Sequence, residues 1–360
     1  MQVGIFDNLQ NGKTVPVTQA MVQEAYRCVK KKAQRVYKNS ERSEKGKKSL
    51  KDDLYILWNR LASGSYYPPP VREVSIPKAR GKGERKLGIA PLTDKVGQMV
   101  IKQLIEPRFE ELFTPSSYGY RPGRSARDAL GEVRKNCWKY DWVVDLDIKG
   151  FFDEIDHELL MRAVSKSVKE KWIQMYIQRW LEAPIEDTEG KKRNREGKGT
   201  PQGGILSPLL ANIYLHYSLD KWLSNNHPTI KFVRYADDIV IHCKSEAEAE
   251  ELLRAVRERL SECKLRVNEE KTKIVYCKDG KRKERYGVCK FDFLGYSFQP
   301  RRIYHPTYKV TVGFLPAISQ QSISKILHKI RETKELRKTE VNLARIASVL
   351  NEQLRGWIKY

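Results

Sequence analysis

Apolar and polar positions recur along this chain with two different periods, which predicts both strands and helices. Short runs of β-branched and aromatic residues predict strands over residues 71–77, 85–90, 142–148, 231–234 and 239–243. Apolar residues at helical spacing predict helices over residues 94–113, 151–164, 172–181 and 206–223. A further short helix is expected to begin near Leu54 and to end before the prolines at 68–70. The pattern therefore predicts a mixed α and β protein.

Turn and capping signals divide these elements. The segment 78–84 is rich in glycine and charge and joins two predicted strands, which indicates a hairpin. A second hairpin is expected from residues 291–298 and 303–312, whereas the cationic segment 186–198 is expected to be a polar loop. Ser245 and Glu248 form a capping-box pattern that opens a helix. Two more helices are expected in the tail, each with Lys and Arg opposite its apolar side.

The charge of the chain points to a polyanionic partner. The 360 residues include 68 Lys and Arg against 45 Asp and Glu, a formal net charge of +23. Each phosphate that a Lys or Arg neutralises releases a condensed counterion, so this excess favours nucleic-acid binding. A membrane surface is the competing interpretation, but no apolar run of about 18 residues and no signal peptide is evident. The six cysteines are scattered, so reduced thiols and a cytoplasmic location are expected.

Two adjacent carboxylates at residues 237 and 238 are the strongest chemical signal. Asp237 and Asp238 follow Tyr235 and Ala236 at a tight turn between two predicted strands. Their charges repel each other and Asp is disfavoured in strands, so they stabilise a fold poorly. Two metal ions about 4 Å apart, held by carboxylates, are the usual device of polymerases. An ordinary hairpin turn remains the alternative for these four residues alone.

A third carboxylate stands at the end of another predicted strand. Asp145 and Asp147 are two residues apart in the run 142–148, so their side chains point to the same face. Only one of them is needed as a metal ligand, and the other is then a hydrogen-bonded surface group. Between this strand and the Asp-Asp turn, paired glycines at 203 and 204 let the backbone approach a ligand closely.

These segments together resemble the bacterial group II intron-encoded reverse transcriptase/maturase family. Seven blocks occur in the family's order: IPK at 76–78 with RKLGI at 85–89, SYGYRPGRS at 117–125, DIKGFFD at 147–153, GTPQGG at 199–204, RYADD at 234–238, NEEKT at 268–272 and FLG at 293–295. The resemblance runs from about Leu57 to the end of the chain. It implies a right-hand polymerase of α/β (α+β) class, with an antiparallel, ferredoxin-like palm sheet and a helical thumb. The implied domains are a basic N-terminal extension (1–53), fingers and palm (54–316), and thumb or start of the maturase domain (317–360).

The resemblance also implies a metal site. Asp147, Asp237 and Asp238 match the family's three catalytic aspartates, and the carbonyl of Ile148 matches an additional metal ligand. Asp147 and Asp237 are expected to bridge two Mg²⁺ ions, with Asp238 peripheral to them and Mn²⁺ as a substitute metal. Hard oxygen ligands and substrate phosphates suit Mg²⁺.

Other matched positions imply contacts with substrates. Lys78 and Arg85 match cations that grip the triphosphate, with ordinary hairpin charges as the alternative. Phe152 matches the sugar gate, a ring that would clash with a ribose 2′-hydroxyl; the alternative is a core aromatic. Gln202 matches a residue beside the nucleotide and template. The positions matched to template or primer contacts are Tyr120, Arg121 and Lys271, each of which is equally compatible with a structural role.

The implied function is RNA-directed DNA polymerisation on an RNA template with a DNA or RNA primer, dNTPs and an intron RNA partner. Three alternatives remain: a maturase that mainly binds intron RNA, a domesticated relative in phage defence or CRISPR spacer acquisition, and an RNA-dependent RNA polymerase, which Phe152 disfavours. Two departures from the family are evident. The segment 39–46 lacks the family's Gly-Val-Asp-Gly-like stretch, and relatives continue beyond the position of Tyr360. The chain is therefore expected to copy RNA but to assist splicing poorly.

Overall fold

The computed structural model describes residues 14–36, 50–77, 84–305, 307, 309–333 and 342–358. Two compact units interleave along the chain. Unit 1 comprises Met1–Pro115, Ile148–His227 and Arg257–Arg266, and unit 2 comprises Ser116–Asp147, Pro228–Val256 and Val267–Tyr360. Among the described residues no helix has the length and apolarity needed to cross a membrane. Lys78 and the segment 39–46 lie outside the described residues.

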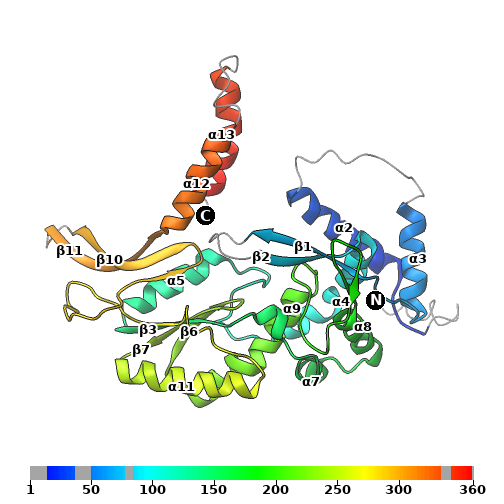
Figure 1. The fold of residues 1–360 in the computed structure, drawn as a ribbon, viewed down its shortest axis with the longest axis horizontal. Helices are drawn as coiled ribbons and strands as arrows, with labels where there is room; N and C mark the ends of the chain where they lie inside the picture. Colours follow the sequence, from blue (N-terminus) through cyan, green and yellow to red (C-terminus); the bar gives the residue numbers. More distant parts are fainter. Residues whose placement is uncertain are drawn as a thin grey trace. The chain divides into compact units, whose positions relative to one another are not determined.

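A four-stranded antiparallel sheet forms the centre of unit 2. Its strands are β3 (Trp142–Asp147), β6 (Lys231–Tyr235), β7 (Asp238–Cys243) and β8 (Lys273–Tyr276), in the spatial order β6-β7-β3-β8. The sheet places β3 beside β7, although about ninety residues of chain separate them (Figure 1). Buried Val143, Val240 and Val275 pack on one face against aromatic and apolar side chains from 291–314. The expected antiparallel sheet is therefore present.

A second sheet in unit 2 corrects the predicted hairpin. We expected strands over 291–298 and 303–312, but the structure has β9 (Phe291–Phe293), β10 (Tyr296–His305) and β11 (Lys309–Ile318). Leu294 and Gly295 have φ values of 48° and 82° and join β9 to β10. Positive φ at both loop residues is the requirement of a two-residue type I′ hairpin, so the strand breaks there. The long antiparallel pair β10–β11 then continues from Tyr296.

Unit 2 also contains helices. They are α5 (Ala126–Cys137), α12 (Gln320–Glu332) and α13 (Leu343–Ile358), while α11 (Glu246–Glu262) runs from unit 2 into unit 1. The backbone N–H of Glu248 donates to Ser245 Oγ at 3.2 Å, as the capping pattern predicts. Both expected tail helices are present, and the first begins two residues after β11 ends. The predicted domain boundaries at 53 and 316 stay predictions.

Unit 1 contains a mixed sheet with the order β2-β1-β4-β5. Strands β1 (Val71–Pro77) and β2 (Glu84–Ile89) are antiparallel, and β1 pairs in parallel with the short β4 (Ile185–Glu186). The segment 186–198 is thus more than a polar loop, because it contains β5 (Lys192–Arg193), which pairs antiparallel with β4. The sequence pattern missed β5 because its residues are charged and exposed.

The helices of unit 1 differ from the expected ones at two breaks. They are α2 (Gln19–Val36), α3 (Leu50–Ala62), α4 (Leu92–Glu110), α6 (Phe151–Glu154), α7 (His157–Ser167), α8 (Lys171–Glu182), α9 (Ser207–Leu215), the π-helix η1 (His216–Asp220) and α10 (Lys221–Asn226). The single helix expected over 151–164 divides at Ile155, and Asp156 caps α7 by accepting the N–H of Leu159 at 2.9 Å. The helix expected over 206–223 widens into η1.

Candidate active site

The carboxylates of Asp147 and Asp238 lie at one end of the unit 2 sheet. Asp147 is the last residue of β3 and Asp238 the first of β7, and the two are direct partners in the antiparallel ladder. Directly opposed residues project to the same face, so both side chains share one side of the sheet. Asp237 lies in the turn before β7, after Ala236 with φ of 57°. The predicted choice of Asp237 over Asp238 as the bridging metal ligand stays a prediction.

The segment 268–272 holds Asp147 through several hydrogen bonds. Asn268 Nδ2 donates to Asp147 Oδ2 at 2.8 Å, and the backbone N–H of Asn268 donates to the Asp147 carbonyl at 2.8 Å. Lys271 Nζ lies 3.1 Å from Oδ2 and 3.2 Å from Oδ1 of Asp147. The N–H of Asp147 donates to Thr272 Oγ1 at 3.3 Å. Both the side chain and the backbone of Asp147 are thereby positioned by one segment.

Negative charge gathers around Asp147 and Asp238. Burial, together with the carboxylates of Asp238 and Asp147, raises the pKa of the Asp145 carboxyl to about 7, while Lys273 opposes this rise. A cation placed among these oxygens would relieve the repulsion between them. Carboxylate oxygens are also the donors that Mg²⁺ prefers. The donor set therefore fits a hard divalent cation, although no group of three or more Asp, Glu, His or Cys side chains within the described residues is arranged as a preformed metal cage.

In unit 1, the short helix α6, which carries Phe152, is hydrogen-bonded to the segment that precedes Gln202. The N–H of Thr200 donates to the Phe152 carbonyl, and that of Gly199 to the Ile155 carbonyl, both at 2.8 Å. His157 Nε2 lies 2.7 Å from the Gly199 carbonyl, and burial lowers the pKa of this imidazole. A Cβ on Gly199 would lie 3.0 Å from the carbonyl oxygen of Asp153, at a φ of 82° that favours glycine.

The Gln202 segment in turn contacts strand β2, which carries Arg85. The N–H of Gly88 donates to the Gln202 carbonyl at 2.7 Å, and a Cβ on Gly203 would lie 2.8 Å from the Gly88 carbonyl oxygen. Backbone contacts in unit 1 therefore link the segments that carry Arg85, Phe152 and Gln202. Phe152 is half-buried, whereas the neighbouring Phe151 is a core residue. Arg85 and Lys86 are consecutive strand residues, so they project from opposite faces of the β1–β2 pair.

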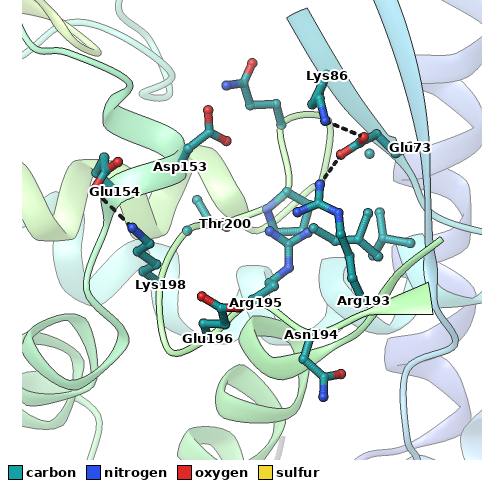
Figure 2. A pocket seen from close by; sticks show the side chains of 16 residues that line it. Glu73, Lys86, Asp153, Glu154, Arg193, Asn194, Arg195, Glu196, Lys198 and Thr200 are labelled. Atoms are coloured by element: carbon teal, nitrogen blue, oxygen red, sulfur yellow. Dashed lines mark hydrogen bonds and ion pairs between the residues drawn. The ribbon is translucent and has the colours of Figure 1, made fainter. Parts of the chain in front are cut away.

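A cavity of about 460 Å³ opens on the Lys86 face of this hairpin. Figure 2 shows Lys86 and Arg193 converging on Glu73, at 3.0 and 2.6 Å from its carboxylate oxygens. Arg195 points into the same space, and burial together with the charge of Arg193 lowers its pKa to about 10. Gln202 is also among the lining residues. The cavity thus combines an ion-paired wall with one further guanidinium.

A series of buried hydrogen bonds holds the backbone between the paired glycines and helix α9. Gln98 Oε1 accepts the N–H groups of Ile205 and Leu206 at 2.9 and 3.2 Å, while its Nε2 donates to Asp94 Oδ2 at 2.8 Å. Asp94 Oδ1 accepts Tyr66 Oη and Trp180 Nε1, each at 2.7 Å. Burial raises the pKa of Asp94. This chain of bonds holds the Gly-Gly segment against the core of unit 1.

Comparison with known protein families identifies the family of this chain. The model of the family described as "Reverse transcriptase (RNA-dependent DNA polymerase)" matches residues 76–298, more than half of the chain. The chain belongs to the reverse transcriptase family. Its matched region contains all the aspartates and every substrate-contact position singled out from the sequence.

The relatives of this reverse transcriptase include a group II intron-encoded protein. It is 32% identical to protein YkfC of Escherichia coli over 325 residues, which cover 79% of this chain and 82% of that protein. It is 30% identical to the group II intron-encoded protein LtrA of Lactococcus lactis over 344 residues, covering 75% of this chain but 54% of LtrA. The chain thus spans about half the length of LtrA. Its homologues include proteins named as intron-encoded, which supports the group II type that the motif order predicted.

Telomerase structures have the same kind of fold. The apo telomerase of Candida tropicalis aligns with a TM-score of 0.50 and 13% identity, covering 75% of this reverse transcriptase and 51% of that chain. The telomerase of Candida albicans in complex with a telomeric RNA fragment gives a TM-score of 0.50 and 13% identity, with 69% and 48% coverage. This likeness confirms the predicted polymerase fold class.

The three positions matched to nucleic-acid contacts lie in different surroundings. Tyr120 is 53% exposed, with φ of 59°, beside the ring of Tyr235. Arg121 is buried, and its Nη1 donates to the Ser117 carbonyl at 2.8 Å. Lys271 contacts the carboxylate of Asp147. Tyr120 and Lys271 are exposed whereas Arg121 is buried, and the assignments of all three stay predictions.

Sequence reasoning missed the residues that support the site from behind. Gln98 and Asp94 sit one helical turn apart on the buried side of α4, and a polar pair within an apolar stripe was the available signal. Asn268 was included in a motif but given no role of its own. Its contact with Asp147 spans 121 residues of sequence, which no local pattern reports.

Proposed function

We propose that this reverse transcriptase extends a DNA or RNA primer with dNTPs on an RNA template, by a two-metal nucleotidyl transfer with Mg²⁺ as the resident ion. The pairing of Asp147 with Asp238 across β3 and β7 is the observation that carries the proposal. Bonds from Asn268 and Lys271 orient one of these carboxylates. A site of this kind attracts divalent cations and presents oxygen ligands to them.

In the proposed reaction the primer 3′-hydroxyl releases its proton to solvent, its oxygen bonds to the α-phosphorus of the dNTP, and the bond from that phosphorus to pyrophosphate breaks. When bound, Mg²⁺ would lower the pKa of the 3′-hydroxyl and neutralise charge on the triphosphate. Asp147, Asp237 and Asp238 are the side chains proposed to hold the ions, together with the carbonyl of Ile148. Asn268 keeps the Asp147 carboxylate in one orientation, so little reorganisation is needed when charge develops.

Selection of the nucleotide is assigned to residues of unit 1. Arg85, with Lys78, is proposed to bind the triphosphate, and Gln202 to lie beside the nucleotide and template. Phe152 is proposed to exclude the ribose 2′-hydroxyl. The backbone bonds from Thr200 and Gly88 support this assignment, because they link the three described segments into one framework.

The polyanionic partner is proposed to be RNA. A net charge of +23 favours phosphate contacts that weaken steeply as salt rises. An A-form duplex offers phosphates and 2′-hydroxyls more readily than base edges, so such contacts are largely independent of sequence. Because LtrA is named as a group II intron-encoded protein, an intron RNA is the proposed physiological partner.

Primer extension on an RNA template with Mg²⁺, and with dNTPs and rNTPs in parallel, tests the proposal. The wild type is expected to extend with dNTPs, whereas Asp147→Ala and Asp237→Ala are expected to lose extension and to keep RNA binding. Asp52→Ala, an exposed substitution in α3, is the matched control. Extension within tenfold of wild type in either site variant would contradict the metal assignment. RNA binding without any extension by the wild type would favour a splicing factor that only binds intron RNA.

A further inference from the structure

Arg234, the residue before the Tyr-Ala-Asp-Asp turn, is fully buried in unit 2. Its relative exposure is 0%. Nη1 of Arg234 donates to the carbonyl of Ala236 at 3.0 Å, inside the turn itself. Nη2 donates to Ser117 Oγ at 2.8 Å, and Ser117 is also fully buried. One guanidinium thus links the catalytic turn to a segment 117 positions away in sequence.

The backbone reinforces this link on both sides of Arg234. The N–H of Arg234 donates to the Ser116 carbonyl and the N–H of Tyr118 donates to the Arg234 carbonyl, both at 2.8 Å. These bonds make an isolated parallel bridge between Ser117 and Arg234. Arg121, itself buried, donates from Nη1 to the Ser117 carbonyl at 2.8 Å. The segment 116–119 is therefore held against the end of β6.

Gly119 brings this segment into direct contact with the turn. A Cβ built on Gly119 would lie 2.4 Å from the backbone nitrogen of Ala236 and 2.9 Å from the carbonyl carbon of Tyr235. Any side chain at this position would have to displace the turn backbone. Ala236 has φ of 57°, a left-handed conformation that is unfavourable for a residue with a Cβ. The surroundings must therefore hold this conformation in place.

We propose that Arg234 and residues 116–119 form a turn clamp that positions Asp237 and Asp238 for cation binding. Arg234 is a positioning residue here: it holds the carbonyl of Ala236, and through it the left-handed turn that aims the two carboxylates. This role rests on the proposed function, because it concerns the metal site of the polymerisation reaction. It also gives part of the block at 117–125 a role in supporting the turn.

The chemistry of the guanidinium suits this task better than that of an ammonium. A planar fork of donors reaches a carbonyl and a hydroxyl in two fixed directions, whereas the single nitrogen of Lys is a point donor on a flexible stem. Replacing Arg234 by Lys keeps the charge but leaves one of the two acceptors without its donor. A buried acceptor that loses its partner is costly, so the turn is expected to shift or loosen. Mutation of a group that orients a metal ligand typically lowers metal affinity or activity by about 10–100-fold.

Three variants perturb the clamp in different ways. Arg234→Lys breaks the fork, Ser117→Ala removes the hydroxyl acceptor, and Gly119→Ala pushes on the turn without removing any donor. Arg254→Lys on the exposed side of α11 is the matched control. The measurements are Mn²⁺ affinity of the free protein by electron paramagnetic resonance, thermal unfolding temperature, and kcat and KM for dNTP in primer extension.

The clamp predicts that each of the three variants weakens Mn²⁺ binding about 10–100-fold and lowers kcat by a similar factor. KM for dNTP is expected to stay within about threefold of wild type, because the turn does not carry the triphosphate-binding residues. Arg234→Lys combined with Ser117→Ala should be non-additive, since both break the same bond. A purely structural role would instead lower the unfolding temperature and leave Mn²⁺ affinity of the folded protein unchanged.

The outcomes separate the clamp from the polymerase proposal. Wild-type Mn²⁺ affinity and kcat in folded Arg234→Lys and Gly119→Ala proteins would overturn the clamp while leaving the polymerase intact. A wild-type protein that binds Mn²⁺ but extends no primer would overturn the polymerase proposal. In that case the Mn²⁺ affinities of the variants still test the clamp.

Discussion

Asn268 bonds Asp147 twice, once from its side-chain Nδ2 to Oδ2 and once from its backbone N–H to the carbonyl, each at 2.8 Å. The two bonds fix the carboxylate and the strand end that carries it. Asn268→Ala removes the first bond and keeps the second. We expect kcat for primer extension to fall about 10–100-fold, because the ligand is no longer oriented. Steady-state primer extension gives this value.

Asn226→Ala is the matched control for Asn268→Ala. Asn226 is exposed and donates to the carbonyl of Trp222 within its own helix. Its substitution is expected to leave kcat unchanged. Equal kcat in the two variants would mean that the bond to Asp147 Oδ2 has no part in positioning the carboxylate.

Arg85 and Lys86 allow a test of which face of the β1–β2 pair meets the nucleotide. The two side chains project to opposite faces of the strand pair. Substitution of either residue by Ala therefore removes the same charge, but from a different face. We expect Arg85→Ala to raise KM for dNTP about tenfold, and Lys86→Ala, whose ammonium pairs with Glu73 at 3.0 Å, to leave it within about twofold. Primer-extension kinetics at varied dNTP supply both values, and the reverse ranking would place the triphosphate on the Lys86 face.

Local patterns were sufficient where the deciding contacts are local. The strand that ends at Asp147 and the helix capped by Ser245 follow from period and capping residues within a few positions. The break at Ile155 escaped prediction because Asp156 competes with the helix by capping α7 itself. Leu294 escaped it because an apolar residue with φ of 48° gives no turn signal in sequence.

The residues that support the site could not be predicted from the sequence, because their contacts join positions far apart in the chain. The bond from Arg234 to Ser117 joins positions in two separate sequence blocks, and the contact between Gly119 and Ala236 depends on a missing Cβ. Family resemblance predicted that these blocks matter and assigned Arg121 to nucleic acid. The buried bond from Arg121 to the Ser117 carbonyl supports the alternative structural role that the sequence left open.

The ion pair between Arg108 and Glu170 predicts a pH-dependent part of the stability. Two bonds of 2.8 and 2.6 Å join the guanidinium and the carboxylate, and they lower the pKa of Glu170 to about 2. Because the folded-state pKa lies below the unfolded value, the contribution is fully present above about pH 5 and is lost as pH falls toward 2. Both side chains are more than a third exposed, so solvent screening limits it to about 1 kcal/mol or less.

Urea unfolding of wild type and Glu170→Gln between pH 7 and pH 2.5 measures this contribution. The difference in unfolding free energy between the two proteins is expected to shrink as pH falls. Glu262→Gln, at an exposed side chain with a single bond to Arg259, is the matched control. A difference that stays constant over this range would show that Glu170 does not titrate differently on folding.

Phe152 provides the most direct test of substrate choice. Its ring is half-buried and lies 5.5 Å from that of Phe151, so one part packs on the core and another part is accessible. The carbonyl of Phe152 accepts the N–H of Thr200 at 2.8 Å, which fixes the backbone that carries the ring. Phe152→Val keeps this bond and removes most of the ring. Steric differences of this size typically alter discrimination by roughly 10–200-fold.

We therefore expect Phe152→Val to lower the ratio of kcat/KM for dNTP over rNTP by about that factor, mainly through better use of rNTP. Phe151→Leu is the matched control: Phe151 is 2% exposed, so its substitution should lower the unfolding temperature and leave the ratio unchanged. Single-nucleotide extension with each dNTP and rNTP pair gives the ratio, and thermal unfolding separates packing from selection. If Phe152→Val discriminates as well as the wild type but unfolds at a lower temperature, Phe152 is a packing residue and the sugar is selected elsewhere.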